Sequence, residues 1–231
     1  MVDWKNQVAR PAPAAGGPFQ GPDQDRAPSP PVPASQALEN SFHEVMARLG
    51  EKGGRCVQLN TPQAFVFKTS IAVLGLLLRT YDMDGVVVAV SKPCDLYRKA
   101  IRARIVTDHP PYYIDLSQAL GGMSGPQSAE DAAYISMFEP DRIDSAVRNG
   151  LQKVAEKYGG EEHFVLFDDL SAMEFYCSTE TVKRFASTFF REMSGLNIHC
   201  FVMAPEEKAS RLFGALPLSC PNRLKVQPEW L

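Results

Sequence analysis

Apolar and polar residues alternate in blocks along the chain, and from about residue 41 the blocks predict strands and helices in turn. Apolar runs of strand length begin at residues 56, 85, 112, 163 and 197, with the sequences CVQLN, GVVVAVS, YYIDL, HFVLFDD and NIHCFVMA. Such nearly continuous apolar strands are typical of a sheet that is buried on both faces.

Helical spacing of apolar residues fills the intervals between these runs. A first helix begins near Ser41, and further helices are predicted over residues 68–81, 95–104, 140–158, 179–193 and 206–216, the third of them after a Gly/Ser-rich loop. In the helix 179–193, Phe185 and Phe189 share one apolar stripe, so we expect both rings to lie against the sheet. Strands that alternate with helices predict a three-layer α/β fold with a parallel sheet.

The first 36 residues differ in composition from the rest. They are dominated by Pro, Ala, Gly, Gln and Asp, and such a segment buries too little apolar surface to offset its conformational entropy. We therefore predict a disordered tail over residues 1–36 and a single folded domain over residues 37–231. The string PSPPVP in the tail contains a PxxP pattern, which would suit either a partner with an aromatic groove or a plain tether.

Composition and charge exclude several classes of protein. The 231 residues are 45% hydrophobic and 22% charged, with a net charge of -3, which is ordinary for a globular protein and provides no basic footprint for nucleic acid. No apolar segment approaches the roughly 18 to 20 residues of a membrane span, and the N-terminus lacks a signal-peptide pattern. The five scattered cysteines include no CxxC pair and predict reduced thiols. We expect a cytoplasmic protein with no membrane contact.

The stretch LNTPQAFVFKTS has the outline of a phosphate-binding loop. In register with the pattern GxxxxGK[ST], Lys68 and Thr69 hold the last two positions, while Pro62 and Phe67 stand where the glycines belong. Proline has no N–H to donate, and Phe67 carries a bulky side chain, so an ordinary phosphate cradle is disfavoured. Lys68 and Thr69 could still face an anion at the helix N-terminus.

Two further strand ends bear on nucleotide chemistry. Asp168 ends the run HFVLF, which is where a magnesium-binding carboxylate would lie, with Asp169 beside it. The alternative is that these aspartates cap the exit of the chain from the strand, and the sequence leaves both open. The run GVVVAVS ends instead at Lys92–Pro93, which provides no carboxylate to orient water.

Other candidate chemistry is sparse. The four histidines are dispersed and lack metal-ligand spacing, so we predict no metal site. The helix LYRKAIRARI is basic, which suits either a solvated face or a patch for a partner; its basic residues are Arg98, Lys99, Arg102 and Arg104.

The segment FVLFDDLSAMEFYCSTETVKRFASTFFREMSGLNIHCFVMAP resembles the fourth strand, helix and fifth strand of RecA/KaiC-type P-loop ATPases, and GVVVAVSKPCDLYRKAI resembles archaeal KaiC-like relatives. The resemblance covers about residues 41–216. It implies a RecA/KaiC-type sheet and a site for ATP and magnesium at Lys68, Thr69 and Asp168. Where the family has its loop glycines, this chain has Pro62 and Phe67, so the resemblance also implies a degenerate Walker A loop.

Three hypotheses follow. The first is a non-catalytic RecA/KaiC-like regulatory or scaffolding domain, a pseudo-ATPase that acts through a protein partner or as a homo-oligomer. The second is an ATP-binding KaiC-like ATPase or switch in signal transduction. The third is a DNA partner of the recombination type, which the acidic balance disfavours. The missing glycines favour the first hypothesis, so catalysis is not expected.

Overall fold

The computed structural model describes residues 34–49, 55–117, 130–135, 141–213 and 220–231. The chain divides into two units, Met1–Pro31 and Val32–Leu231, and every element described below belongs to the second. Most of the predicted tail lies outside the described residues. Helix α1 already begins at Ala34, seven residues before the start expected from the sequence.

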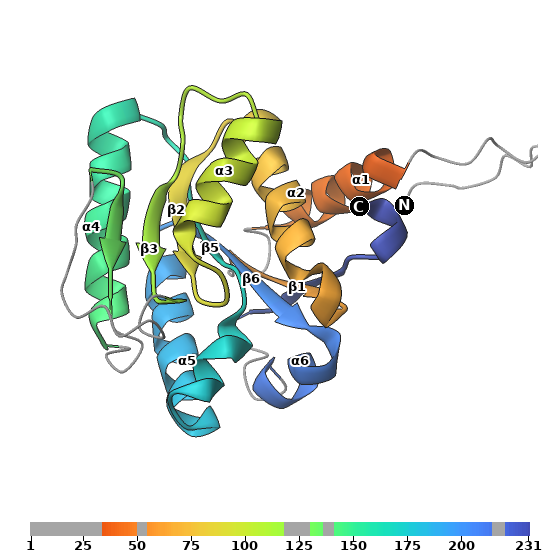
Figure 1. Ribbon diagram of the computed structural model, residues 1–231, viewed down its shortest axis with the longest axis vertical. Coiled ribbons are helices and arrows are strands. Elements are labelled where there is room, and N and C mark those ends of the chain that lie inside the picture. The colour runs from red at the N-terminus through yellow and green to blue at the C-terminus, as the bar shows by residue number, and fades with distance from the viewer. Residues whose placement is uncertain (1–33, 50–54, 118–129, 136–140, 214–219) are drawn as a thin grey trace, which may run out of the picture. The chain divides into compact units, whose positions relative to one another are not determined.

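A seven-stranded sheet forms the centre of this unit, in the order β4-β3-β2-β5-β6-β1-β7 (Figure 1). Every neighbouring pair is parallel. Strand β1 lies between β6 and the edge strand β7. In its register, Leu59 lies opposite Met203 of β6 and opposite Leu224 of β7. The strands are β1 (Cys56–Thr61), β2 (Asp84–Ala89), β3 (Tyr112–Asp115), β4 (Ala132–Tyr134), β5 (His163–Phe167), β6 (His199–Pro205) and β7 (Asn222–Lys225).

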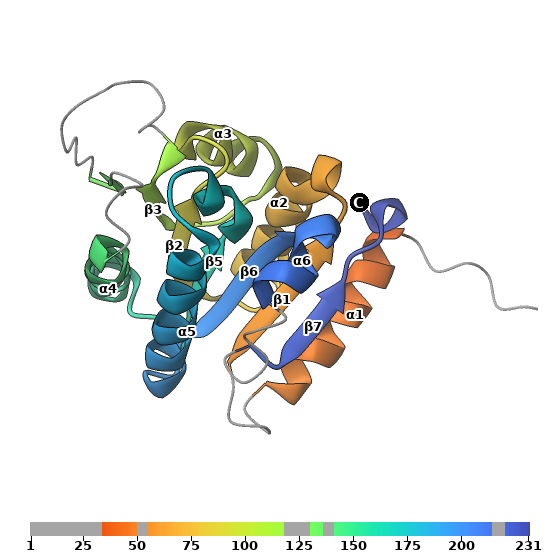
Figure 2. The same cartoon turned by 90° about the horizontal axis from the view of Figure 1, so that it is seen from below.

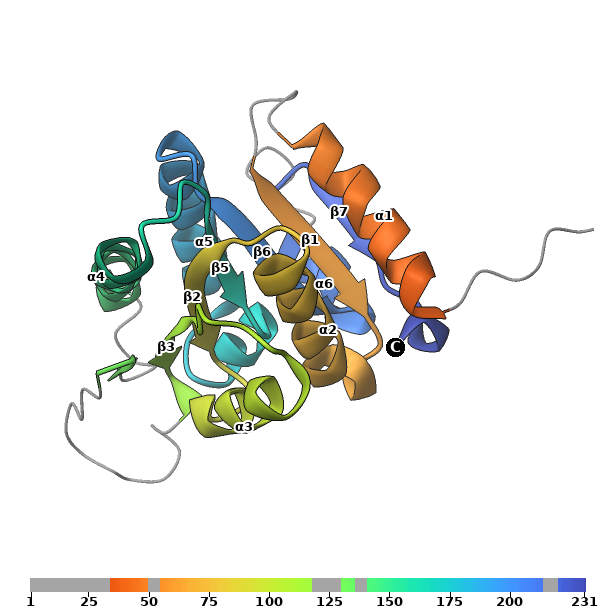
Figure 3. The ribbon, with the colours of Figure 1, turned by 90° about the horizontal axis from the view of Figure 1, so that it is seen from above.

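Helices cover both faces of the sheet (Figures 2 and 3). The first three helices and the last three contribute to two separate hydrophobic clusters, one on each face, so the unit has three layers. One face carries α1 (Ala34–Arg48), α2 (Val66–Arg79) and α3 (Cys94–Arg104). The other carries α4 (Asp141–Tyr158), α5 (Thr179–Gly195) and α6 (Glu206–Phe213). None of the described helices has the length and apolarity needed to cross a bilayer.

The predicted three-layer α/β fold with a parallel sheet is thus confirmed, and the predicted strands and helices are all present. The sequence analysis missed β4 and β7, which are three and four residues long. Strands this short give little periodicity to detect. The 3-10 helices Gln63–Phe65, Leu170–Phe175 and Pro228–Trp230 were also not predicted.

The apolar stripe of α5 lies on the sheet as predicted. Phe189 is buried, and its ring meets that of Phe167 edge to face at 5.3 Å. Phe185 is only partly buried and lies farther from Phe167, with ring centroids 6.2 Å apart. Phe185 also lines a groove of about 330 Å³ beside α4 and α5, together with Phe189, Asp144 and Arg184.

The cysteines differ from the sequence expectation. Cys56 and Cys220 form a disulfide that ties the start of β1 to the chain just before β7, with Cα atoms 4.7 Å apart. The prediction of reduced thiols is wrong for this pair, because residues 164 positions apart meet at adjacent strands. Cys94, Cys177 and Cys200 are free thiols. Disulfides are typical of proteins in oxidising compartments and rare in the cytosol. The predicted cytoplasmic location therefore gains no support from this pair and stays a prediction.

Candidate functional site

The candidate site lies at the carboxyl edge of the sheet, where α/β proteins bind their ligands. The sheet order places β2 beside β5, and β6 between β5 and β1. The ends of these strands carry the loop pattern between β1 and α2, Lys92–Pro93, and Asp168, all of which the sequence analysis singled out.

The β1–α2 connection does not form an open phosphate loop. After Thr61 the chain has one extended residue, Pro62, with φ -57° and ψ 145°, and then turns at once into the 3-10 helix Gln63–Phe65. Two of its N–H groups are used within the turn, since Phe65 N donates to the Pro62 carbonyl at 2.8 Å and Val66 N donates to the Gln63 carbonyl. Helix α2 begins at Val66, two residues before the start predicted from Lys68. Neither these two N–H groups nor Pro62, which has none, can donate to a phosphate in this conformation.

Lys68 and Thr69 point in different directions. Consecutive residues on a helix are rotated by about 100°, and here the Lys68 side chain is exposed while Thr69 is fully buried. The Thr69 hydroxyl donates to Thr61 Oγ1 at 3.2 Å. The structure thus places Lys68 at the surface and ties Thr69 to the end of β1.

Aromatic side chains lie between α2 and α3. Phe67, at the second glycine position of the loop pattern, meets Tyr97 of α3 edge to face with ring centroids 5.0 Å apart. Tyr97 is fully buried, and its hydroxyl donates to Asp168 Oδ2 at 3.0 Å. A side chain at the position of a loop glycine is therefore part of the packing around Asp168.

The Asp168 carboxylate is fully buried and binds the turn between β2 and α3. Its oxygens accept hydrogen bonds from Val90 N at 2.7 Å, from Ser91 N at 3.1 Å and Ser91 Oγ at 3.0 Å, and from Lys92 N at 3.3 Å, besides the Tyr97 hydroxyl. A carboxylate has about four lone-pair sites, so these five donors saturate it. Burial raises the pKa of Asp168 to about 6, although the hydrogen bonds from Val90 and Ser91 act in the opposite direction.

Asp169 has the capping role that the sequence left as an alternative. It is the N-cap of the 3-10 helix Leu170–Phe175, and its Oδ1 accepts from the N–H of Ser171 at 3.0 Å and from the Ser171 hydroxyl at 2.5 Å. Both aspartates at the end of β5 therefore bind polar groups of the protein itself.

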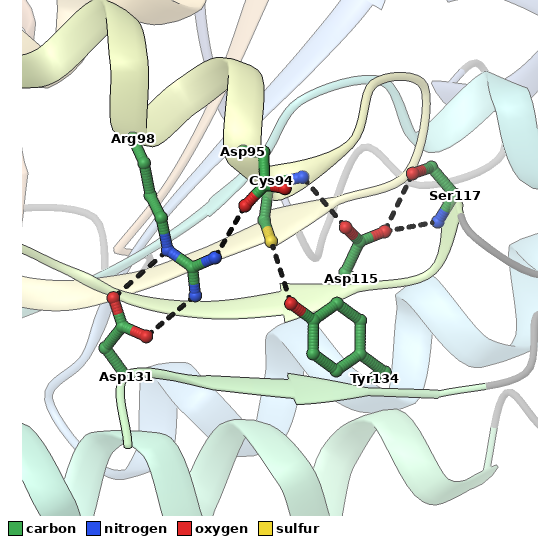
Figure 4. A network of polar contacts seen from close by, with 7 residues as sticks. All are labelled: Cys94, Asp95, Arg98, Asp115, Ser117, Asp131 and Tyr134. Atoms are coloured by element: carbon green, nitrogen blue, oxygen red, sulfur yellow. Dashed lines mark hydrogen bonds and ion pairs between the residues drawn. The ribbon is translucent and has the colours of Figure 1, made fainter. Parts of the chain in front are cut away.

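Asp115, at the end of β3, is a second buried carboxylate that holds the start of α3 (Figure 4). Its Oδ2 accepts from Cys94 N at 2.8 Å, and its Oδ1 accepts from Ser117 N and Ser117 Oγ. A carboxylate is favourable at a helix N-terminus because it binds free N–H groups there. Sequence reasoning missed Asp115, although the run YYID ends in an aspartate just as HFVLFDD does.

Arg98 connects α3 to the strands on the outer side of this network (Figure 4). Its guanidinium binds Asp95 of the same helix and Asp131 before β4, both at 2.7 Å, and lies 5.2 Å from the centre of the Tyr113 ring. The predicted basic cluster is thereby divided, since Arg98 is paired while Lys99, Arg102 and Arg104 are exposed.

Metal chemistry has no support among the described residues. In that part of the chain, no three His, Cys, Asp or Glu side chains are grouped so that they could hold an ion. The buried carboxylates of Asp168 and Asp115 are instead surrounded by N–H and O–H donors.

Comparisons with known proteins concern the fold. No protein-family model and no curated protein sequence matches the chain. A KaiC-like protein of the hyperthermophilic archaeon Pyrococcus horikoshii has 12% identity over 76% of this chain and 71% of its own, with a TM-score of 0.49. An uncharacterised protein of the same organism, solved with an unknown peptide, has 16% identity over 74% and 77%, with a TM-score of 0.54. A further solved structure, an ATPase domain, has 14% identity over 82% and 81%, with a TM-score of 0.41.

At these identities the similarity extends to the fold and not to the chemistry of the site. The all-parallel sheet agrees with the parallel sheet that the sequence predicted. The chain has a three-layer α/β fold with an all-parallel sheet, and it shares this fold with the archaeal protein solved with a peptide.

Proposed function

We propose that this chain is a non-catalytic RecA/KaiC-like module that acts through protein contacts, with another protein or with further copies of itself. The observation that carries the proposal is the saturation of Asp168 by five donors from the β2–α3 turn and from Tyr97. Magnesium in nucleotide sites is bound through carboxylate oxygens, waters and phosphates. A carboxylate whose lone pairs all accept hydrogen bonds from the protein does not fit that role.

The β1–α2 connection supports the same proposal. Catalysis of phosphoryl transfer depends almost entirely on positioning and on stabilisation of charge. Here Lys68 is exposed, Thr69 is buried against Thr61, and the N–H groups of Phe65 and Val66 are bonded within the turn. We infer that the residues present do not fit ATP with magnesium, and that ATP hydrolysis is no faster than background.

Protein contact is favoured over nucleic acid by the charge of the chain. A net charge of -3 provides no general attraction for a polyanion. The similar archaeal protein that was solved with an unknown peptide supports a polypeptide partner.

The deciding experiment is isothermal titration calorimetry of the full chain with ATP, with and without magnesium, on the wild type and on Lys68→Ala. Lys92→Ala is the matched control, because Lys92 is an exposed lysine at the same edge of the sheet. We expect no saturable heat from any of the three proteins.

Magnesium-dependent binding that is lost in Lys68→Ala and kept in Lys92→Ala would overturn the proposal. It would establish the ATP-binding switch in its place, with Lys68, Thr69 and Asp168 as the nucleotide and magnesium positions. Thermal unfolding of each variant, followed by circular dichroism, ensures that a loss of binding is not a loss of structure.

A further inference from the structure

The outer side of α3 combines exposed apolar residues with exposed basic residues. The helix buries Cys94, Tyr97 and Ile101 against the core. On its other side, Leu96, Lys99 and Ala103 are exposed, and Val106 is exposed two residues beyond the helix end. Leu96 is 43% and Val106 is 90% exposed. Residues spaced three and four apart share one side of a helix, so Leu96, Lys99 and Ala103 form a line on α3. Val106 follows in the chain beyond the helix, after the extended residue Ile105. We call these four residues the α3 seam.

Positive charge surrounds the α3 seam. Lys92, Lys99, Arg102 and Arg104 are exposed, and within the part of the chain that the structure describes none of them forms an ion pair. Asp95, the one acidic residue of α3, is bound to Arg98. The chain as a whole has a net charge of -3, so this basic surface is a local feature. It favours a partner whose contacting surface is acidic.

The surface is also held in a fixed conformation. The turn before α3 is bound by Asp168 through the N–H groups of Val90, Ser91 and Lys92, and the first turn of α3 is bound by Asp115 through Cys94 N. A surface that is already ordered loses little conformational entropy when it binds. The two buried carboxylates therefore prepare α3 for contact.

We propose that the α3 seam docks an acidic helical segment of a partner protein. Apolar residues of that segment, spaced three and four apart, would pack on Leu96 and Ala103 of α3, as in helix pairs with a heptad pattern, and one would contact Val106 beyond the helix end. Its carboxylates would face Lys99 and Arg102. On α3 the seam runs from Leu96 to Ala103, a rise of about 10 Å, which is close to two helical turns. This inference rests on the proposed role in protein contacts and names the surface and the chemistry of the partner.

A nucleic acid fits this surface less well than an acidic helix. The apolar positions of the seam are aliphatic side chains, and single-stranded nucleic acid is bound by aromatic side chains on which bases stack. A partner helix satisfies both the apolar line and the charges around it.

The test uses two synthetic helical peptides with leucines spaced three and four apart, one with glutamate and one with lysine at the flanking positions. Binding to the full chain is followed by fluorescence anisotropy. We expect the glutamate peptide to bind saturably and less tightly at high salt, and the lysine peptide not to bind. The double variant Lys99→Glu, Arg102→Glu should lower the affinity for the glutamate peptide by about tenfold or more. The same variant should bind the lysine peptide. Leu96→Asp should also weaken the glutamate peptide.

The matched control reverses two charges on α5, with Lys183→Glu and Arg191→Glu, and should leave binding of the glutamate peptide unchanged. If the glutamate peptide does not bind, or if the α5 variant weakens it as much as the α3 variant does, the proposed docking is wrong. Binding of phosphatidylglycerol vesicles that is lost in Leu96→Asp, without binding of the peptide, would overturn it in favour of a membrane surface. Any of these failures leaves the proposed function intact, because that depends on the separate nucleotide titration.

Discussion

Two connections leave the carboxyl edge of the same sheet, and they are held in different ways. The β1–α2 connection closes on itself through the turn at Pro62 and through the Thr69–Thr61 hydrogen bond. The β2–α3 connection is bound by the two strands that flank β2 in the sheet. Asp168 follows β5, and Asp115 is the last residue of β3. In the first, the polar groups are local; in the second, two buried carboxylates come from distant parts of the chain.

The difference shows how an acidic residue at a strand end should be interpreted. Asp168 has the sequence context of a magnesium ligand, yet its oxygens accept backbone and side-chain donors. A buried carboxylate is stable only when its lone pairs are satisfied. The question for function is therefore which donors satisfy it, and here they belong to the protein.

The largest expected effect comes from removing the acceptor of the β2–α3 connection. Asp168→Ala would leave the N–H groups of Val90, Ser91 and Lys92 and the hydroxyl of Tyr97 without their acceptor. Each unsatisfied buried donor costs about 1 to 3 kcal/mol, and since some regain water we expect a loss of about 4 kcal/mol in the free energy of unfolding. Urea denaturation measures it. A loss below about 1 kcal/mol would mean that Asp168 does not hold the turn.

The second effect is a dependence of stability on pH. Burial raises the pKa of Asp168 from 3.8 to about 6 in the folded chain. Between pH 6 and pH 4 the folded chain therefore binds more protons than the unfolded chain, and the free energy of unfolding should rise as pH falls across this window. The contribution is fully present below the unfolded pKa and is lost as pH rises through 6. It amounts to about 3 kcal/mol at most.

Asp168→Asn provides the control for this effect, because it cannot titrate. The difference in stability between the wild type and this variant should change between pH 4 and pH 6 and stay constant from pH 7 to pH 8. A difference that is the same at every pH would show that another group is responsible.

These effects separate what the sequence could predict from what it could not. The alternation of apolar runs gave the layers, the parallel strands and the stripe of α5, because these follow from local periodicity. The start of α2 was misplaced, since the pattern around Lys68 does not show that residues 63–65 are already helical. The donors to Asp168 lie at residues 90–97, more than 70 positions away, so no local pattern could assign them.

A smaller effect is expected at the contact between the two connections. Tyr97→Phe removes one of the five donors to Asp168 and keeps the edge-to-face packing on Phe67. Because the other four donors remain, we expect a loss of about 1 kcal/mol. Phe67→Ala is the counterpart, which keeps the hydrogen bond and removes the ring contact. If Tyr97→Phe costs as much as Asp168→Ala, the hydroxyl and not the backbone turn is the main partner of the carboxylate.

The smallest effects belong to the two residues that a phosphate loop would need. Thr69→Val removes the buried hydroxyl that donates to Thr61 Oγ1 at 3.2 Å, so we expect a loss of about 1 kcal/mol. Lys68 is exposed, and Lys68→Ala should change the free energy of unfolding by less than about 0.5 kcal/mol.

A ligand that binds the folded state raises its thermal midpoint. Adding ATP with magnesium should therefore leave the midpoints of both variants and of the wild type unchanged. If ATP raises the thermal midpoint of the wild type but of neither variant, the β1–α2 connection still binds a nucleotide. The closed turn and the Thr69–Thr61 hydrogen bond would then not prevent nucleotide binding, and the difference between the two connections would be structural only.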